Sequence, residues 1–380
     1  MKNIYWRPSG ISEKVLLLLA LVSVSFMYVV ETFKIREKQP YYREKIQAAR
    51  LAQKAFSFVK KQKLERGIAI DKETDPSMSA LIGVLMSSVT SNSGSLSSKQ
   101  TSVNPNFAAV MVQLLKKAGA RDGDIVACGI SGSFPAINIA LFAAMQTLNL
   151  KPVIISSVSG SQWGANNPEY LWIDMEKDLH DAGMFQFKSV TASYGGIEDR
   201  AMGLSRKGKT IIETKISQSG LPLLQAETFL ENINERMRIY STFSETSPVK
   251  VYVNIGGGSI SVGRKVGKKM YAPGLNRSLP PGAYEYDSVM TRFIQDGIPV
   301  IHITQIEAMA RKYGLPNKPD KMPPVGDGII YIREEYNKWL AGFVLLLLLA
   351  MLYLFHNTDI GHKLLKSNTS KSSNGIEPMI

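Results

Sequence analysis

Two uninterrupted apolar runs, one near each end, dominate the hydropathy pattern of this chain. They cover residues 15–30 and 339–355, and neither contains a charged residue. A helix crosses a hydrocarbon core of roughly 30 Å with about 17 to 25 apolar residues, and flanking Lys14 and Lys338 extend short spans by snorkelling. Both runs therefore predict transmembrane helices that anchor the chain in a lipid bilayer.

Each run has a competing interpretation. The first has the length and basic flank of a cleaved signal peptide, but no small-x-small cleavage site follows, since the chain continues Val30-Glu31-Thr32. The second has the length of a buried core helix, but its consecutive leucines leave no polar face. We therefore expect two anchors.

Two spans place both termini on the same side of the membrane. Lys and Arg are almost equally frequent in the terminal tails and in the flanks of the central region. The positive-inside rule consequently gives no direction, and because long domains cross regardless of charge, an extracytoplasmic central domain is favoured.

The pattern between the anchors changes from helical to alternating strand and helix. Residues 39–64 predict a juxtamembrane helix, with Ile46, Ala49, Phe56 and Val59 near helical spacing, that acts as a spacer or lies on the bilayer surface. Residues 87–102 are serine-rich and predict a loop. Beyond them, strands are predicted at 124–128, 152–158, 187–192, 249–255 and 298–303, and helices at 136–148, 168–182, 222–240, 286–295 and 305–313.

Short apolar strands alternating with helices predict an α/β fold, a mostly parallel, Rossmann-like layered sheet covered on both faces. The expected order is a tail (1–14), a transmembrane helix (15–30), the juxtamembrane helix and entry (31–86), the α/β domain (87–330), a second transmembrane helix (339–355) and a polar tail (356–380). A boundary within the domain near 207–218 is a further expectation.

Composition adds a positive charge but little else. The formal net charge is +13 over 380 residues, which suits anionic partners such as lipid headgroups or a polyanionic polymer. Nucleic acid is a poor fit for a doubly anchored chain without a recognition motif. Cys128 is the only cysteine, so a disulfide within the chain is impossible.

Ligands bind open α/β sheets beyond the carboxyl ends of the strands, and three loops there are candidate sites. The first has Gly129, Ser131, Gly132 and Ser133 between a strand and a helix, where free amides favour an anion. It is close to the G-x-S-x-G nucleophile elbow, which makes Ser131 a candidate nucleophile with His302 as its base. A turn with a helix cap is the structural alternative.

The second loop follows the next strand. Ser161 and Asn166 offer polar groups and Trp163 a stacking face, whereas a plain loop would use Asn167 to cap a helix that begins at Pro168.

The third loop has a run of small residues after a strand. Its candidate anion-binding residues are Asn254, Gly256, Gly257, Gly258 and Ser259, followed by the basic residues Arg264, Lys265, Lys268 and Lys269. The run resembles the phosphate loop of actin-like ATPases, which Asp normally leads. No P-loop, G-x-G-x-x-G fingerprint or paired zinc ligands occur, and no cofactor is assigned.

Longer phrases add a family resemblance. K-Q-T-S-x-N-P at 99–105, G-x-S-G-S-F-P-A at 129–136, S-x-W-G-A-N-x-P at 161–168 and the glycine run at 254–258 resemble the poly-gamma-glutamate system protein family. This resemblance implies a role beside the bacterial machinery that polymerises glutamate through its γ-carboxyl group and exports the polymer. The ligase of that machinery uses ATP and a P-loop, which this chain lacks.

Three functions remain in competition. The first is a non-catalytic membrane-anchored accessory subunit that binds an anionic ligand, the polymer or the synthase, and the absence of a complete catalytic set favours it. The second is a serine-type hydrolase or transferase acting on the polymer through Ser131. The third is a nucleotide-binding module that uses the loop at 256–258.

Overall fold

The computed structural model describes residues 13–243 and 247–357, so most of the two predicted tails lies outside it. The chain divides into two compact units, 1–37 with 332–380, and 38–331. The second unit is the α/β domain, and it begins well before residue 87. The predicted boundary at 207–218 falls inside helix α7 (Arg206–Ser219).

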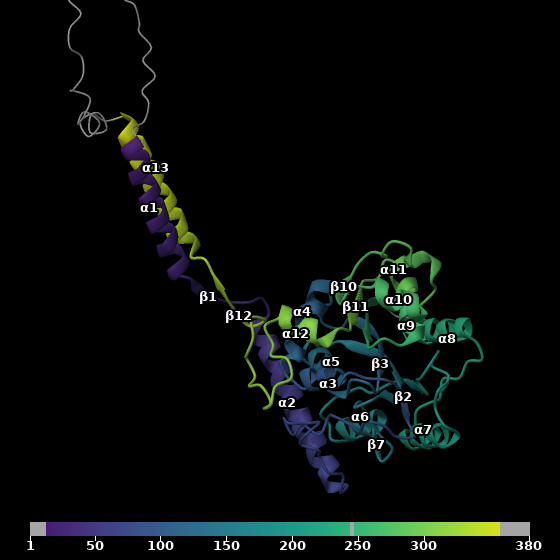
Figure 1. Ribbon diagram of the computed structural model, residues 1–380. Helices are drawn as coiled ribbons and strands as arrows, with labels where there is room; N and C mark the ends of the chain where they lie inside the picture. The colour runs from purple at the N-terminus through teal and green to yellow at the C-terminus, as the bar shows by residue number, and fades with distance from the viewer. Residues whose placement is uncertain (1–12, 244–246, 358–380) are drawn as a thin grey trace, which may run out of the picture. The chain divides into compact units, whose positions relative to one another are not determined.

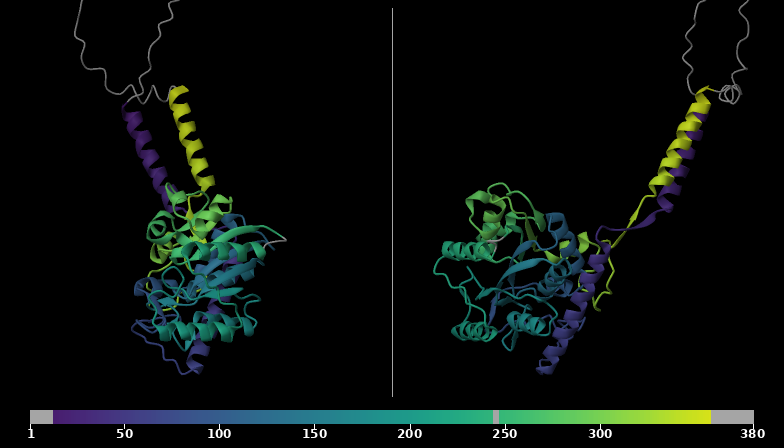
Figure 2. Two further views of the ribbon diagram at one scale, coloured as in Figure 1. Left: turned by 90° about the vertical axis from the view of Figure 1, so that its right-hand side faces the viewer. Right: turned by 180° about the vertical axis from the view of Figure 1, so that it is seen from behind.

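The first unit is a helix pair joined by a short ribbon. Helix α1 (Glu13–Thr32) packs beside α13 (Lys338–Asn357), and strand β1 (Ile35–Lys38) pairs with β12 (Ile332–Glu335) (Figures 1 and 2). The Tyr336 hydroxyl donates to Glu31 at 2.8 Å, and the Lys34 amine lies 5.0 Å from the Tyr336 ring centre.

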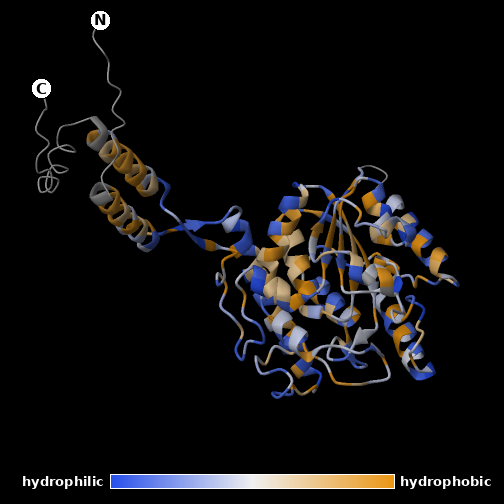
Figure 3. Ribbon diagram, turned by 45° about the horizontal axis from the view of Figure 1, so that its top comes forward, coloured by the Kyte–Doolittle hydropathy of each residue, from blue (hydrophilic) through white to orange (hydrophobic). Residues whose placement is uncertain are grey.

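Both helices coincide with the predicted apolar runs, and Figure 3 shows them coloured mostly as hydrophobic. Their large apolar side chains are mostly exposed. In the part of the chain that the structure describes, no helix has both the length and the apolar character needed to cross a membrane.

A six-stranded sheet forms the centre of the second unit, which confirms the α/β class. Its strands, in spatial order, are β10 (Gly274–Asn276), β11 (Val300–Ile303), β9 (Val249–Ile255), β3 (Ile125–Ser131), β4 (Lys151–Ser157) and β8 (Thr191–Ser193). All neighbouring pairs are parallel except β10 with β11. Counted along the chain, the five parallel strands have the order 3-2-1-4-5, which is the doubly wound arrangement.

Helices cover both faces of this sheet (Figure 2). On one face lie α2 (Tyr42–Glu65), α4 (Phe107–Ala118), α5 (Pro135–Thr147), α6 (Trp172–Asp181) and α12 (Ile306–Lys312). On the other lie α8 (Phe229–Thr242), α9 (Ser259–Val262) and α11 (Val289–Gln295). Along β3, Val126 and Cys128 pack on the first face and Ala127 on the second, as the alternation of strand side chains requires.

The expected juxtamembrane helix is part of this core. Helix α2 packs against α4 and α5, and Ala48, Ala52, Ala55 and Phe56 are buried there. Its stripe of small residues lets the three helices approach closely, so α2 is part of the α/β domain and not a bare spacer.

Several predicted elements differ from the structure. The serine-rich segment contains strand β2 (Thr90–Asn92) and helix α3 (Leu96–Ser102), whose first turn is capped by the Ser95 hydroxyl accepting from the Ser98 amide at 3.2 Å. Pro168 lies between two-residue strands β6 (Asn166–Asn167) and β7 (Tyr170–Leu171), and α6 begins only at Trp172. The Asn167 side chain accepts from the Glu169 amide in this turn, so the prediction that it caps the helix is wrong.

Other elements were not predicted at all. Helices α4 and α7, the short helix α10 (Arg264–Met270) and strand β10 are additional. Of the remaining segments, β5 (Gly160–Ser161) pairs with β2 and ties the serine-rich segment to the loop after β4.

Candidate functional site

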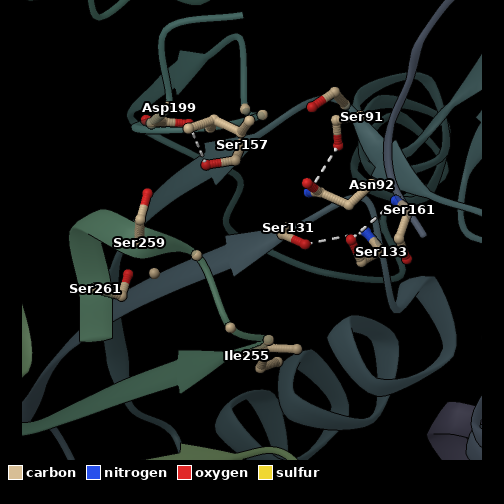
Figure 4. A pocket seen from close by; sticks show the side chains of 18 of the residues that line it. Ser91, Asn92, Ser131, Ser133, Ser157, Ser161, Asp199, Ile255, Ser259 and Ser261 are labelled. Carbon is tan, nitrogen blue, oxygen red and sulfur yellow. Dashed lines mark hydrogen bonds between the residues drawn. The ribbon is translucent and has the colours of Figure 1, made fainter. Parts of the chain in front are cut away.

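A cavity of about 940 Å³ lies at the carboxyl ends of the central strands. The register of the sheet brings Ser131 of β3 beside Ser157 of β4, and Gly129 beside Asn254 of β9. The strands that follow β3 along the chain, β4 and then β8, lie on one side of it, and β9, which comes next, lies on the other. The direction of the strand order therefore reverses beside β3. This position is the topological switch point, where doubly wound sheets bind ligands. Small residues dominate the lining, which includes eleven serines and seven glycines. Figure 4 shows several of these serines.

The loop from β3 to α5 supplies Gly129, Ser131 and Ser133 to the lining. The Ser133 amide donates to the Ser131 hydroxyl at 3.0 Å, and the Ser133 hydroxyl accepts from the Ser161 amide at 3.1 Å. Gly132 has a different role, because a Cβ there would lie 2.5 Å from the carbonyl oxygen of Val158. Gly132 therefore allows two loops to pack together and does not line the cavity.

Of the three candidate residues in the second loop, Ser161, Trp163 and Asn166, only Ser161 lines the cavity. The Asn166 side chain accepts from the Val84 amide at 2.9 Å and donates to the Val84 carbonyl at 2.8 Å, so it holds a neighbouring segment in place. Trp163 is half-buried against the main core, with a φ of 56°. The structure does not support a ligand-contacting role for Asn166 or Trp163.

The third loop lines the cavity with Asn254, Gly256, Gly257, Gly258 and Ser259. The Asn254 side chain donates to the Gly256 carbonyl at 2.7 Å, which fixes the turn. Among the described residues, the amides of Gly257 and Gly258 have no acceptor. Such unused donors at a cavity are suited to an anionic group.

The basic residues after this loop contribute less charge than expected. The Arg264 guanidinium lies 3.1 Å from Glu198 and over the Phe229 ring, and it remains exposed. The side chains of Lys265 and Lys268 lie outside the description. The loop at 195–203 faces Ser259, whose hydroxyl accepts from the Glu198 amide at 2.9 Å.

The geometry does not support a Ser131–His302 pair. His302 is buried in β11, its Nδ1 is 3.0 Å from the Asn254 side-chain nitrogen, and it does not line the cavity. His180, on α6, does not line it either. The Ser131 hydroxyl instead accepts from a backbone amide.

Lys99 lines the cavity and was missed as a site residue, although it stands in the first motif of the resemblance. Its side chain is 2% exposed. The amine donates to the Ser133 carbonyl and to the Ser161 hydroxyl, the latter at 2.9 Å, and lies 3.6 Å from the Phe134 ring centre. Burial lowers the pKa of the Lys99 amine to about 7, since desolvation penalises the charged form.

A buried ion pair on the opposite wall has no signal in the sequence. Arg236 of α8 and Asp199 are both nearly buried and hydrogen-bonded to each other. Asp199 also accepts from the Ser157 hydroxyl at 2.8 Å (Figure 4). Arg236 donates to the Ser193 hydroxyl at 3.0 Å. This network ties α8 and the loop at 195–203 to the ends of β4 and β8.

Strand order and cavity together define a doubly wound α/β protein with a cavity at its switch point. The chain matches no family model, no curated protein and no solved structure. The resemblance to the poly-gamma-glutamate system family therefore stays a prediction.

Proposed function

We propose that this protein is a membrane-attached accessory component of poly-gamma-glutamate synthesis or export, and that its α/β domain binds an acidic ligand, such as a segment of the polymer, in the cavity at the switch point. The observation that carries the binding proposal is the convergence of all three predicted loops on one cavity. The context rests on the motifs that resemble the family.

The cavity is chemically suited to carboxylates. Its serine hydroxyls and the amides of Gly257 and Gly258 are hydrogen-bond donors, and the Lys99 amine adds a donor with no carboxylate among its described contacts. The Ser159 hydroxyl is buried at the lining and has no partner among the described residues. Because buried polar groups are normally paired, this hydroxyl supports a ligand that completes the site.

Membrane attachment is the second part of the proposal. Large apolar side chains on both terminal helices are exposed, including Leu17, Leu21, Phe343 and Leu346. Apolar surface of this kind is removed from water by lipid or by another apolar partner. The two basic residues beside the runs, Lys14 and Lys338, are suited to the headgroup region.

A nucleotide is the alternative ligand, because doubly wound sheets bind phosphates at the same place and the glycine loop offers free amides. We therefore propose to titrate the full-length protein in detergent with an oligomer of γ-linked glutamate and, separately, with ATP, and to follow binding by calorimetry. The glutamate oligomer is expected to bind, and to bind more weakly as salt is added.

Two substitutions at one position provide the control. Gly258 has a φ of −59° and open space around its Cβ position, so it accepts a side chain. Gly258→Asp adds a negative charge beside the free amides, whereas Gly258→Asn adds the same volume without charge. We expect Gly258→Asp to bind the oligomer at least about tenfold more weakly than Gly258→Asn. Equal affinities, or binding of ATP alone, contradict the proposal.

A further inference from the structure

Three lysines of the domain are buried with amines that donate to no carboxylate among the described residues. Lys45 donates to the Ile330 carbonyl at 2.9 Å, and Lys63 donates to the Ala80 and Ile82 carbonyls at 3.0 and 3.2 Å. These two join segments through backbone acceptors and do not line the cavity. Burial of a lysine in this fold is therefore not by itself a sign of chemistry.

Lys99 differs from them in two respects. It lines the cavity, and one of its partners is the hydroxyl of a serine that also lines the cavity, Ser161, at 2.9 Å. The Ser133 hydroxyl accepts from the Ser161 amide, and the Lys99 amine also donates to the Ser133 carbonyl, so both partners are held in place. A serine hydroxyl within hydrogen-bond reach of a desolvated amine is the arrangement of an activated nucleophile and its base.

We propose that Ser161 and Lys99 form a nucleophile–base pair that catalyses acyl transfer on an amide or ester bound in the cavity. The inference rests on the proposed ligand site, since the bond to be cleaved has to enter the same cavity. This pair takes the place of the predicted pair of Ser131 and His302, because His302 is buried in β11 and does not line the cavity.

In the first half of the reaction, the Ser161 hydroxyl oxygen adds to the substrate carbonyl carbon while its proton passes to the neutral Lys99 amine. The tetrahedral intermediate then expels the leaving amine or alcohol, which takes that proton from Lys99. The products are an ester on Ser161 and a free leaving group.

In the second half, a water molecule gives a proton to Lys99 and adds to the ester carbonyl. The bond to the Ser161 oxygen breaks, and Lys99 returns the proton to that oxygen. The balance is one amide and one water converted to one acid and one amine, and no oxidant or reductant is needed. An amine that replaces the water would make the second half a transfer.

The burial of Lys99 suits this role. A base must be unprotonated at the working pH, and the lowered pKa of the Lys99 amine leaves a substantial neutral fraction near pH 7. An ordinary exposed lysine would be almost fully protonated there.

A fluorophosphonate probe tests the pair without knowledge of the substrate, because a reactive serine displaces its fluoride and keeps the phosphonyl group. Full-length protein in detergent is incubated with the probe, and the modified residue is located by tandem mass spectrometry. We expect one adduct, on Ser161, that is absent from Ser161→Ala. We also expect the labelling rate to rise with pH through about 7 as Lys99 loses its proton.

Matched lysine variants separate chemistry from folding. Lys99→Met should lower the labelling rate at least tenfold, whereas Lys63→Met, which also removes a buried amine, should label at the rate of the unchanged protein. If Lys99→Met fails to fold, Lys99→Arg keeps a charged donor that cannot act as a base, and it should also label slowly. If neither folds, the pH profile of the unchanged protein decides.

Several outcomes overturn the inference: no adduct, an adduct on Ser131, a rate unaffected by the Lys99 variants, or a flat pH profile. The result also remains separate from the proposed function. An adduct on Ser161 in a protein that binds no glutamate oligomer supports the Ser161–Lys99 pair and contradicts the proposed ligand. Binding of the oligomer without an adduct supports the proposed ligand and contradicts the pair.

Discussion

Lys99 couples the stability of the fold to pH. The pKa of its amine is lowered to about 7 by burial and is near its ordinary value, about 10.5, once the chain unfolds. Between these values the unfolded chain binds more protons than the folded one. The free energy of unfolding should therefore rise as pH increases from about 7 to about 10.5, since the charged amine penalises folding at the acidic end.

This pH dependence is measurable by chemical denaturation at several pH values. Lys45, whose pKa burial lowers to about 8, and Lys63, whose pKa burial also lowers, act in the same direction. Lys99→Met should therefore flatten the rise without abolishing it. A Lys99→Met protein with the same pH slope as the unchanged one would show that this amine titrates as an exposed group does.

Arg236 and Asp199 illustrate the cost of an unpaired buried charge. Both side chains are less than 10% exposed, so removal of one leaves the other charge buried without its partner. Arg236→Met should lower the free energy of unfolding by about 3 to 5 kcal/mol.

The double variant Arg236→Met with Asp199→Asn is the control for that effect. It removes both charges and should recover a large part of the loss, which denaturant titration of the four proteins measures as a coupling energy. Simple additivity of the two single changes would contradict a direct pairing.

At the scale of elements, close packing between loops gives the site its shape. Gly132 brings the loop after β3 against the loop after β4, and its missing side chain is what permits the contact with the Val158 carbonyl. Gly132→Ala should destabilise the protein by about 1 to 3 kcal/mol, because the two loops must separate. Gly258→Ala, which meets nothing within 4 Å, should stay within about 0.5 kcal/mol of the unchanged protein by thermal denaturation.

How far the elements could be predicted follows from their burial. Strand β9 was predicted with its observed ends, because a run of β-branched and aromatic residues buried on both faces has a clear pattern. Helix α4 was missed, although its polar residues Gln113, Lys116 and Lys117 recur at helical spacing on the one side that is not fully buried. Helix α7, with Gly208 and several β-branched residues, has low intrinsic helix propensity, and packing against α6 stabilises it instead.

The candidate site was predictable only in part for a similar reason. Because strands of a parallel sheet end at one edge, the loops holding Ser131, Ser161 and Gly257 could be placed near one another from the sequence. Lys99 and Asp199 reach the same cavity from segments whose position depends on tertiary contacts. No local sequence pattern predicts such contacts, although the serine-rich composition of the segment before Lys99 is unusual.

At the scale of the whole molecule, the terminal unit constrains the proposed membrane attachment. Strand β1 pairs with β12, and the Tyr336 hydroxyl donates to Glu31, so α1 ends where α13 begins. The two helices consequently run in opposite directions, and the start of α1 lies at the same end as the end of α13. This arrangement is the one that two anchors with both termini on one side require.

The proposed membrane attachment can therefore be tested together with its sidedness. Membranes of bacteria producing the full-length protein are washed at alkaline pH, and the protein should stay in the pellet because exposed leucines on both helices favour lipid over water.

Reporter enzymes fused at either terminus should then report the same side of the membrane. A reporter inserted at 244–246, between α8 and β9, should report the opposite side. Extraction by the alkaline wash removes the attachment proposal, and unlike signals from the two termini remove the paired arrangement. An insertion signal from outside the cytoplasm would place the cavity where exported polymer is found, whereas a cytoplasmic signal would place it with the synthase.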